Sequence, residues 1–157
     1  MKSVLFVCTG NTCRSPLAEA LFREMVKERA DFEVRSAGLG AYTGQPAAQH
    51  SATLAKKRGL DLSKHRSRSL TEDLIDSATH IFGMSRHHLS AIESDFPEAA
   101  DKVYLLTEFT ADDYLRGADL PDPFGMDISA YQELLRSLEK VLPSVLAYIE
   151  QTTKSAD

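Results

Sequence analysis

Near its N-terminus the chain reads Val4-Leu5-Phe6-Val7-Cys8-Thr9-Gly10-Asn11-Thr12-Cys13-Arg14-Ser15-Pro16, and this stretch decides the fold. Its apolar start shows no polar alternation, which is typical of a central strand in a parallel sheet. Gly10 and Asn11 tolerate positive φ and allow a turn after the strand. Ser15 is a favourable N-cap and Pro16 suits a first helical turn, so we predict a helix that begins near Pro16.

The loop predicted between this strand and this helix is suited to binding an anion. Its backbone N–H groups have no ladder or helix partner, and they gather at a helix N-terminus. The thiol of Cys8 and the guanidinium of Arg14 stand at its two ends. Taken singly, Cys8 could be a buried strand-end residue and Arg14 a surface residue. In the spacing Cys8-x5-Arg14 they indicate a nucleophile beneath a bound phosphate.

The chemistry expected of this loop is attack by sulfur on phosphorus. A thiol beside a helix N-terminus and a cation ionises near neutral pH, so Cys8 is predicted to form a cysteinyl phosphate. Ser15 could donate a hydrogen bond to its thiolate. Fixed N–H donors and Arg14 would stabilise the charge on the phosphate oxygens. The residues predicted to surround the phosphate are Thr9, Gly10, Asn11, Thr12, Cys13, Arg14 and Ser15.

The whole chain, residues 1–157, has the length and composition of one globular domain. No apolar run reaches the roughly 20 residues of a membrane span, and the apolar run near the N-terminus is too short for a signal peptide. Cys8 and Cys13 lie five residues apart, which is poor spacing for a structural disulfide. We therefore expect a cytoplasmic, monomeric protein with reduced thiols and no membrane partner.

The charge of the chain argues against a nucleic-acid partner. Its formal net charge is -5, and no basic stripe interrupts the acidic balance. Such a chain repels anions at long range. Phosphate affinity is therefore expected to come from the local loop.

Hydrophobic periodicity predicts strands that alternate with helices. After the first strand, further strands are expected at Phe32–Ser36, Thr79–Met84 and Lys102–Leu106. Helices are expected at about Pro16–Ala30, Pro46–Arg58, Leu70–Ser77, Arg86–Ser94 and Ile128–Ile149, the last with a kink at Pro143. This order predicts an α/β fold: a single domain with a four-stranded parallel sheet, helices on both faces, and a phosphate-binding loop between the first strand and the first helix.

A proton donor for the leaving group is expected outside this loop. The segment Glu108–Met126 contains several Gly and Pro residues and is too long for a simple connection, which is typical of functional loops. Within it, Asp122 stands between Pro121 and Pro123, which hold the backbone extended. An aspartate in a proline-rich turn is also common without any catalytic role, so this motif alone leaves both interpretations open.

Three motifs, in this order, resemble the low-molecular-weight protein tyrosine phosphatases. They are Val7-Cys8-Thr9-Gly10-Asn11-Thr12-Cys13-Arg14-Ser15-Pro16, then Ser36-Ala37-Gly38, then Asp122-Pro123-Phe124-Gly125. The resemblance covers nearly the whole chain. It implies a four-stranded parallel sheet, Cys8 as nucleophile, Arg14 as phosphate clamp and Asp122 as general acid and then general base.

The same resemblance implies supporting roles and a simple chemistry. Asn11 and Ser15 would shape the loop and stabilise the thiolate, and Ser36 would brace the loop from below. No metal is implied, and we expect no cofactor. The substrate would be a phosphorylated protein.

Three positions depart from the tyrosine-specific pattern. Thr12 replaces the usual Ile or Leu, Phe124 replaces a frequent Tyr, and Met84-Ser85 replaces Met-Asp. Thr12, together with Asp122-Pro123-Phe124-Gly125, resembles the bacterial protein arginine phosphatase branch, which implies a preference for phosphoarginine. Thr12 could instead only satisfy a hydrogen bond within the loop. Tyr42, an aromatic wall candidate, suits a phosphotyrosine ring, although a guanidinium also stacks on such a ring.

The remaining candidates are the second cysteine and the histidines. Cys13 could resolve an oxidised Cys8 by forming a reversible disulfide, or it could be a small buried hydrophobic residue. The histidines lack metal-ligand spacing and are predicted to lie on the surface: His50, His65, His80, His87 and His88.

Two other classes of function are compatible with such a loop. Thiol-dependent arsenate reduction would need further cysteines to relay a disulfide, and the chain has only two. A non-catalytic phosphate-binding or redox-sensing module would need no Asp122. A phosphatase that acts through cysteinyl phosphate accounts for both the loop and Asp122.

Overall fold

The sheet has four parallel strands in the order β2-β1-β3-β4. The computed structural model describes residues 1–154. The strands are β1 (Lys2–Cys8), β2 (Phe32–Gly38), β3 (His80–Gly83) and β4 (Val103–Leu105). Because β2 lies on one side of β1 and β3 lies on the other, the order in which strands are added to the sheet reverses at β1. Such a switch point opens a crevice at the carboxyl end of the strand, so Cys8 lies at the expected place for a site.

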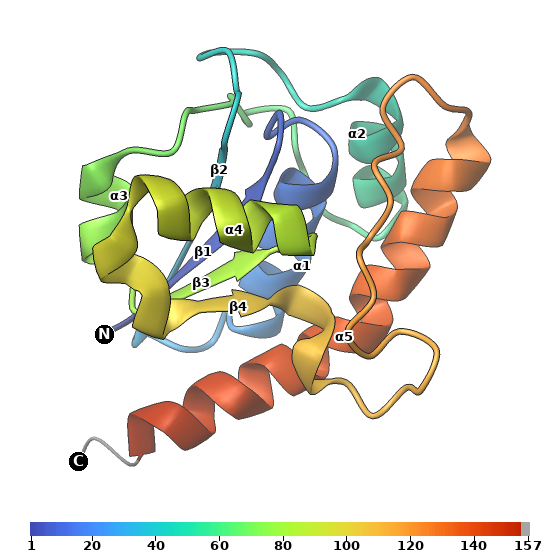
Figure 1. The fold of residues 1–157 in the computed structure, drawn as a ribbon. Coiled ribbons are helices and arrows are strands. Elements are labelled where there is room, and N and C mark those ends of the chain that lie inside the picture. The colour runs from blue at the N-terminus through green and yellow to red at the C-terminus, as the bar shows by residue number, and fades with distance from the viewer. Residues whose placement is uncertain (155–157) are drawn as a thin grey trace.

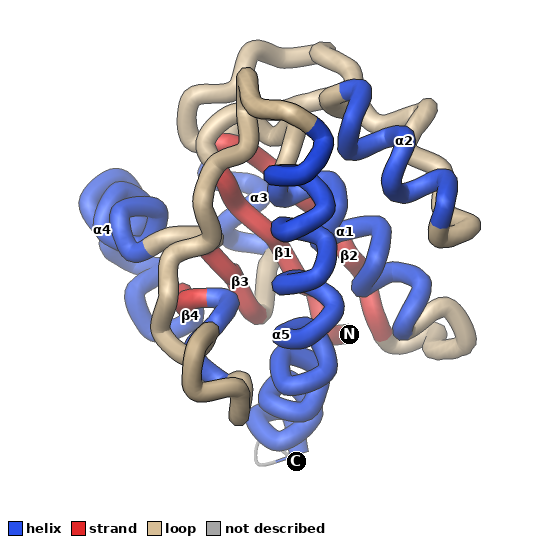
Figure 2. Tube along the Cα trace, turned by 90° about the vertical axis from the view of Figure 1, so that its right-hand side faces the viewer, coloured by secondary structure: helices blue, strands red, loops and turns tan. Residues whose placement is uncertain are grey.

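Helices cover both faces of this sheet (Figures 1 and 2). The long helices α1 (Arg14–Met25) and α5 (Ile128–Lys154) pack on one face, and α3 (Glu72–Ser77) and α4 (Arg86–Asp95) pack on the other. The helix α2 (Gln49–Lys57) packs against α1 and α5. Short 3-10 turns, η1 (Pro97–Lys102) and η2 (Leu106–Phe109), flank β4. The predicted fold class is confirmed.

Alternating residues of β1 enter two separate cores. Val4 and Phe6 pack with α1 and α5, whereas Leu5 and Val7 pack with α3 and α4. This double burial explains the continuous apolar run of the sequence, because neither face of a covered parallel strand meets water. Both cores therefore hold the strand that carries Cys8.

Several predicted element boundaries need correction. The helix α1 begins at Arg14 rather than Pro16, because the Ser15 hydroxyl faces Cys8 and Asn11 instead of capping the helix. It also ends earlier than predicted, at Met25. The helix α2 begins at Gln49 rather than Pro46, since Ala48 is extended and its N–H donates to the carbonyl of Thr12.

The C-terminal helix is longer than predicted. It continues past Ile149 to Lys154 and contains Pro143, and Figure 1 shows a change of direction about half-way along it. A proline removes one helical hydrogen bond and is a usual cause of such bends. Within residues 1–154, no helix is long and apolar enough to cross a membrane.

Candidate active site

Cys8 lies at the carboxyl end of β1, where its thiol is buried beside Ser15. Its Sγ atom is 2.9 Å from Ser15 Oγ, and the Ser15 hydroxyl oxygen accepts a hydrogen bond from Asn11 Nδ2 at 2.8 Å. Because that oxygen accepts from Asn11, its own hydrogen is free to point at sulfur. The arrangement therefore provides the sulfur of Cys8 with a hydroxyl donor.

Asn11 is the centre of a buried hydrogen-bond network that shapes the loop. Its Nδ2 also donates to Ser36 Oγ at 2.9 Å, and Ser36 donates to the Glu19 carboxylate at 2.6 Å. Its Oδ1 accepts the backbone N–H of Arg68 at 3.0 Å. Asn11 has φ of 56°, the only positive value among non-glycine residues of the described chain. Side-chain bonds of this kind hold a residue in a conformation that costs backbone energy.

Gly38 lets β2 approach this loop closely. A Cβ atom at Gly38 would lie 2.6 Å from the carbonyl oxygen of Thr9 and 3.0 Å from the nitrogen of Asn11. The neighbouring N–H groups of Leu39 and Gly40 donate to the carbonyls of Cys8 and Thr9. The motif Ser36-Ala37-Gly38 is thus explained, since only glycine fits at its third position.

Arg14 is buried and held from three sides. One terminal nitrogen donates to the carbonyl of Leu120 at 2.9 Å and lies 3.4 Å from Ser85 Oγ. The other lies 3.5 Å from Thr9 Oγ1. Its Nε is buried and has no hydrogen-bond partner within residues 1–154. Such a guanidinium is fixed in direction and retains donor capacity, as a phosphate clamp requires.

Asp122 reaches this arginine from a distant part of the chain. We call residues 110–127 the Asp122 segment; Leu115 and Leu120 bury its start in the core. An oxygen of the Asp122 carboxylate lies 3.8 Å from Arg14, and the other accepts the N–H of Phe124. About half of its side chain remains exposed. The predicted acid and the predicted clamp are therefore neighbours, although 108 positions separate them in the numbering.

The two neighbouring loop residues Thr12 and Cys13 differ in their surroundings. Thr12 is half-buried, and its carbonyl accepts the N–H of Ala48. Cys13 is buried, its Sγ lies 3.4 Å from the Tyr131 hydroxyl, and burial raises the pKa of its thiol. Both Cys8 and Cys13 are free thiols. Cys13 is thus part of the packing between the loop and α5, whereas Thr12 is partly exposed and its hydroxyl lies 3.8 Å from Cys13 Sγ.

The two predicted aromatic contacts are exposed. Tyr42 is 82% exposed and Phe124 is 73% exposed, so neither ring is used in the core. Large exposed aromatic rings next to a polar site are typical of binding surfaces. Nothing among the described contacts restricts either ring to a structural role.

The prediction that all histidines lie on the surface is wrong for three of them. His88 is fully buried, with Nδ1 accepting the N–H of Ser85 and Nε2 3.0 Å from Thr9 Oγ1. Burial, and then the nearby Arg14 charge, lower the pKa of His88 to about 3. His65 bonds to the carbonyl of Asn11 at 2.8 Å, and His80 is buried beneath Tyr148 and Thr152.

Sequence reasoning missed these histidines for a physical reason. His88 follows Ser85 by three residues, which is capping-box spacing, and Ser85 replaces the usual acid after Met84. That signal was visible, but the contact to Thr9 depends on how α4 packs on the sheet. Neutral His88 and the hydroxyl of Ser85 therefore surround Arg14 without an additional negative charge.

A group of possible metal ligands lies apart from the loop. The exposed carboxylates of Glu72, Asp76 and Glu98 have oxygens within 4.8 Å of one another. Exposed acidic side chains often gather without an ion, and these three belong to α3 and η1. None of them contributes to the contacts around Cys8.

Known proteins are similar to this chain in sequence and in fold. A sequence model of the family "Low molecular weight phosphotyrosine protein phosphatase" matches residues 3–155. A protein-arginine-phosphatase of Geobacillus stearothermophilus is 40% identical over 139 residues, which cover 88% of this chain and 90% of that protein. The low molecular weight protein-tyrosine-phosphatase Etp of Escherichia coli K12 is 31% identical, with 88% of each chain covered.

The fold is also similar to that of solved structures. The solved structure of the YwlE arginine phosphatase from Geobacillus stearothermophilus superposes with a TM-score of 0.88 at 36% identity, covering 100% of this chain and 98% of that one. Sequence, fold and the order of motifs agree over the full described length. The chain therefore belongs to the low molecular weight phosphotyrosine protein phosphatase family.

Proposed function

We propose that this chain is a cysteine-dependent protein phosphatase that hydrolyses phosphoarginine through a cysteinyl phosphate on Cys8. The observation that carries the proposal is the convergence of three groups from separate elements. Ser15 places a hydroxyl 2.9 Å from the Cys8 sulfur, and Asp122 lies 3.8 Å from the buried Arg14. A nucleophile, an anion clamp and a proton donor are what phosphoryl transfer to sulfur requires.

The first step transfers the phosphoryl group to sulfur. The Cys8 thiolate forms the S–P bond while the P–N bond to the substrate guanidine breaks, and its electron pair moves to nitrogen. Asp122 gives its proton to that nitrogen, so arginine leaves as its guanidinium cation and Asp122 becomes a carboxylate. Arg14 and the N–H groups of residues 9–15 stabilise the charge on the phosphoryl oxygens, and the free Arg14 Nε supports this role.

The second step releases phosphate. Asp122, now a carboxylate, accepts a proton from water as the water oxygen attacks phosphorus, and the S–P bond breaks to restore the thiolate. Ser15 stabilises the returning negative charge on sulfur through the same hydrogen bond. Asn11 and Ser36 act as positioning residues, because they contact Ser15 and each other rather than the reacting atoms.

Thr12 supports phosphoarginine as the substrate. It is smaller than the Ile or Leu of tyrosine-specific relatives, and it is half-buried at the loop. Room beside the phosphorus and a hydroxyl able to contact a polar nitrogen suit a guanidinium. Once Asp122 has given up its proton, its carboxylate also attracts the guanidinium cation of the leaving arginine. The similarity to named arginine phosphatases, at 40% identity, agrees with this choice.

Phosphotyrosine is the second candidate substrate. The exposed rings of Tyr42 and Phe124 favour it, because an aromatic leaving group can stack between or upon such rings. A guanidinium stacks on the same rings. The exposed rings are therefore compatible with both substrates, and we expect the size of the side chain at residue 12 to discriminate between them.

The test compares hydrolysis rates on phosphoarginine and phosphotyrosine peptides of one sequence. The native chain should prefer phosphoarginine, and Thr12→Ile should lower that preference about tenfold or more, which is the usual effect of added side-chain volume in a pocket. Thr12→Val is the matched variant, since it keeps the shape and removes the hydroxyl. An unchanged ratio in Thr12→Ile would show that residue 12 is not the filter.

The cellular setting is proposed from the same residues. We expect the chain to act on phosphorylated proteins as a cytoplasmic monomer, with no nucleic-acid or membrane partner and no metal or cofactor. The two free thiols suit a reducing compartment. Cys13 could still trap an oxidised Cys8 in a disulfide, although its raised pKa makes its thiolate scarce.

A further inference from the structure

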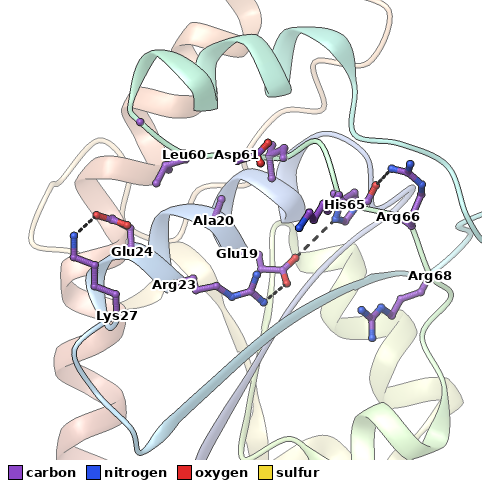
Figure 3. A pocket seen from close by; sticks show the side chains of 13 residues that line it. Glu19, Ala20, Arg23, Glu24, Lys27, Leu60, Asp61, His65, Arg66 and Arg68 are labelled. Carbon is purple, nitrogen blue, oxygen red and sulfur yellow. Dashed lines mark hydrogen bonds and ion pairs between the residues drawn. The ribbon is translucent and has the colours of Figure 1, made fainter.

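A cavity lies beside the phosphate loop, residues 8–15, and no residue of that loop lines it. It has a volume of about 440 Å³ and opens between α1 and the segment 59–68. Figure 3 shows Glu19 and Arg23 of α1 on one side, and His65, Arg66 and Arg68 on the other. Ala20 and Leu60 contribute apolar surface. The cavity is large enough for a small organic molecule.

The charge of this cavity is opposite to that of the chain. Five cationic side chains line it: Arg23, Lys27, Lys64, Arg66 and Arg68. Three carboxylates also line it, so the balance is two positive charges when His65 is neutral. The whole chain carries -5. A concave surface of this kind concentrates anions locally even though the protein as a whole repels them.

The three carboxylates already have partners. Glu19 accepts from Arg23 at 2.7 Å, and Glu24 accepts from Lys27 at 2.7 Å. Asp61 accepts the backbone N–H of Ser63.

Three cations of the cavity, Lys64, Arg66 and Arg68, form no ion pair within the described residues. Arg66 donates to two backbone carbonyls. The hydrogen bond from Ser63 lowers the pKa of Asp61, and the charge of Lys64 helps to lower it. Within residues 1–154, no ion pair involves Lys64 or Arg68, and Figure 3 draws no interaction from the Arg68 side chain. Since the side chains of Lys64 and Arg68 donate no hydrogen bond within residues 1–154, together they match a ligand with at least two negative charges. Guanidinium groups bind tetrahedral oxyanions through two parallel hydrogen bonds, so phosphate is the favoured group.

The wall of the cavity is bonded to the phosphate loop. The backbone N–H of Arg68 donates to Asn11 Oδ1 at 3.0 Å, and His65 Nε2 lies 2.8 Å from the carbonyl of Asn11. Glu19 accepts from Ser36, which in turn accepts from Asn11. Three residues of the cavity therefore hold, directly or through one serine, the residue with φ of 56°. A ligand that moved any of them would act on the loop that carries Cys8.

We propose that this cavity is a binding site for a small phosphorylated molecule and that its occupant alters turnover at Cys8. Arg68 and Lys64 bind the phosphate, and Ala20 and Leu60 contact the rest of the ligand. Binding of the phosphorylated molecule in the cavity does not depend on the proposed phosphatase function, whereas the effect on turnover rests on it. An acidic peptide is the alternative occupant, but the cavity volume favours a small molecule.

Binding is tested by calorimetric titration of inorganic pyrophosphate into the full chain with Arg14→Ala, which removes the clamp of the phosphate loop. We expect one saturable site. Adding Arg68→Glu should weaken binding tenfold or more, since a charge-assisted bond is lost and a repulsion is added. Lys64→Glu should act in the same direction. Arg136→Glu, an exposed arginine of α5 paired with Glu133, should leave binding unchanged.

Several results would overturn the site. They are no saturable binding in Arg14→Ala, binding that neither Arg68→Glu nor Lys64→Glu weakens, and tighter binding of a hexaglutamate peptide than of pyrophosphate. Arg68→Glu and Lys64→Glu are both measured, so that the binding site is still tested if one of these variants misfolds.

The effect on turnover is measured with saturating substrate, which excludes competition at Cys8. Pyrophosphate should change kcat of the native chain and should leave kcat of Arg68→Glu unchanged. A constant native kcat would overturn the coupling. If the chain hydrolysed no phosphorylated substrate, the proposed function would fail, and the calorimetric result would still decide whether the cavity binds the anion.

Discussion

The phosphate loop and the Asp122 segment meet at Arg14 but are held by different kinds of contact. In the loop, the side chains of Asn11 and Ser15 are buried and bonded to one another. In the segment, Asp122 is about half exposed, and within the described residues its carboxylate accepts a hydrogen bond only from the N–H of Phe124, two residues away. One region is fixed by its own network, and the other is attached mainly through Leu115 and Leu120.

This difference matches the two tasks of the proposed reaction. Attack at phosphorus needs the thiolate and its N–H donors in one geometry, since fixed donors are what stabilise the transition state. Protonation of the leaving group needs a carboxyl that can approach a large substrate and exchange protons with water. A half-exposed aspartate between two prolines suits that second task. Changes in the two regions should therefore have different consequences.

Among the substitutions in these two regions, Asp122→Asn should have the largest effect on turnover. It should lower turnover of phosphoarginine by about 10²–10⁴-fold, the usual contribution of a general acid, and should leave folding stability nearly unchanged because the residue is exposed. Phosphate esters with good leaving groups should lose less in the first step. The measurement is kcat on substrates of graded leaving-group strength.

Asp119→Asn is the matched control for that experiment. Asp119 lies in the same segment, but its carboxylate bonds to Arg86 on α4 rather than to Arg14. It should keep native turnover. Equal losses in Asp122→Asn and Asp119→Asn would mean that the segment acts through its conformation and not through one carboxyl.

Gly38→Ala should damage the loop through its backbone. The new Cβ would stand 2.6 Å from the carbonyl of Thr9, so the loop or β2 must move. We expect a loss of about 1–3 kcal/mol in the free energy of unfolding, together with lower turnover. Gly40→Ala is the control, because nothing lies within 4 Å of its Cβ position. Denaturant unfolding compares the two, and similar values would contradict the close packing of this loop.

His88 should make the free energy of unfolding depend on pH. The pKa of His88 is about 3 in the folded protein, because of burial and then the charge of Arg14, and about 6.5 in the unfolded chain. Between these values the unfolded state binds a proton that the folded state does not. The stabilising contribution is therefore present above pH 6.5 and is lost as the pH falls toward 3, by at most about 1.4 kcal/mol per pH unit.

The pH effect is checked with His88→Gln. The unfolding free energy of the native chain should fall more steeply below pH 6.5 than that of the variant, whereas His50→Gln should leave the native slope. Parallel curves for the native chain and His88→Gln would contradict a buried neutral histidine beside Thr9.

Much of the fold could be predicted from the sequence, because its causes are local. The apolar run of β1 and the stripe of α5 each reflect burial that repeats along one element. The predicted ends of helices were less accurate where a side chain bonds to another part of the chain and does not cap the helix. Ser15 has the chemistry of an N-cap but bonds to Cys8 and Asn11 instead.

The site was predictable to the extent that its residues are neighbours in sequence. Cys8 and Arg14 share one loop, and their spacing alone indicates their chemistry. Asp122 was found through its flanking prolines, but its approach to Arg14 depends on Leu120 packing into the core. His88 and the cavity beside Arg68 could not be predicted, because each requires the relative positions of two distant elements.

Trapping the cysteinyl phosphate tests most directly whether Cys8 is the nucleophile and Asp122 the acid and base. Asp122→Asn is mixed with an aryl phosphate that needs no acid to leave, quenched rapidly, and digested to locate the bound phosphate. Formation should remain fast while hydrolysis slows, so phosphate should accumulate on Cys8 toward one per chain, and the double variant with Cys8→Ala should carry none there. No accumulation in Asp122→Asn, or phosphate on another residue, would contradict a thiolate nucleophile served by a separate acid and base.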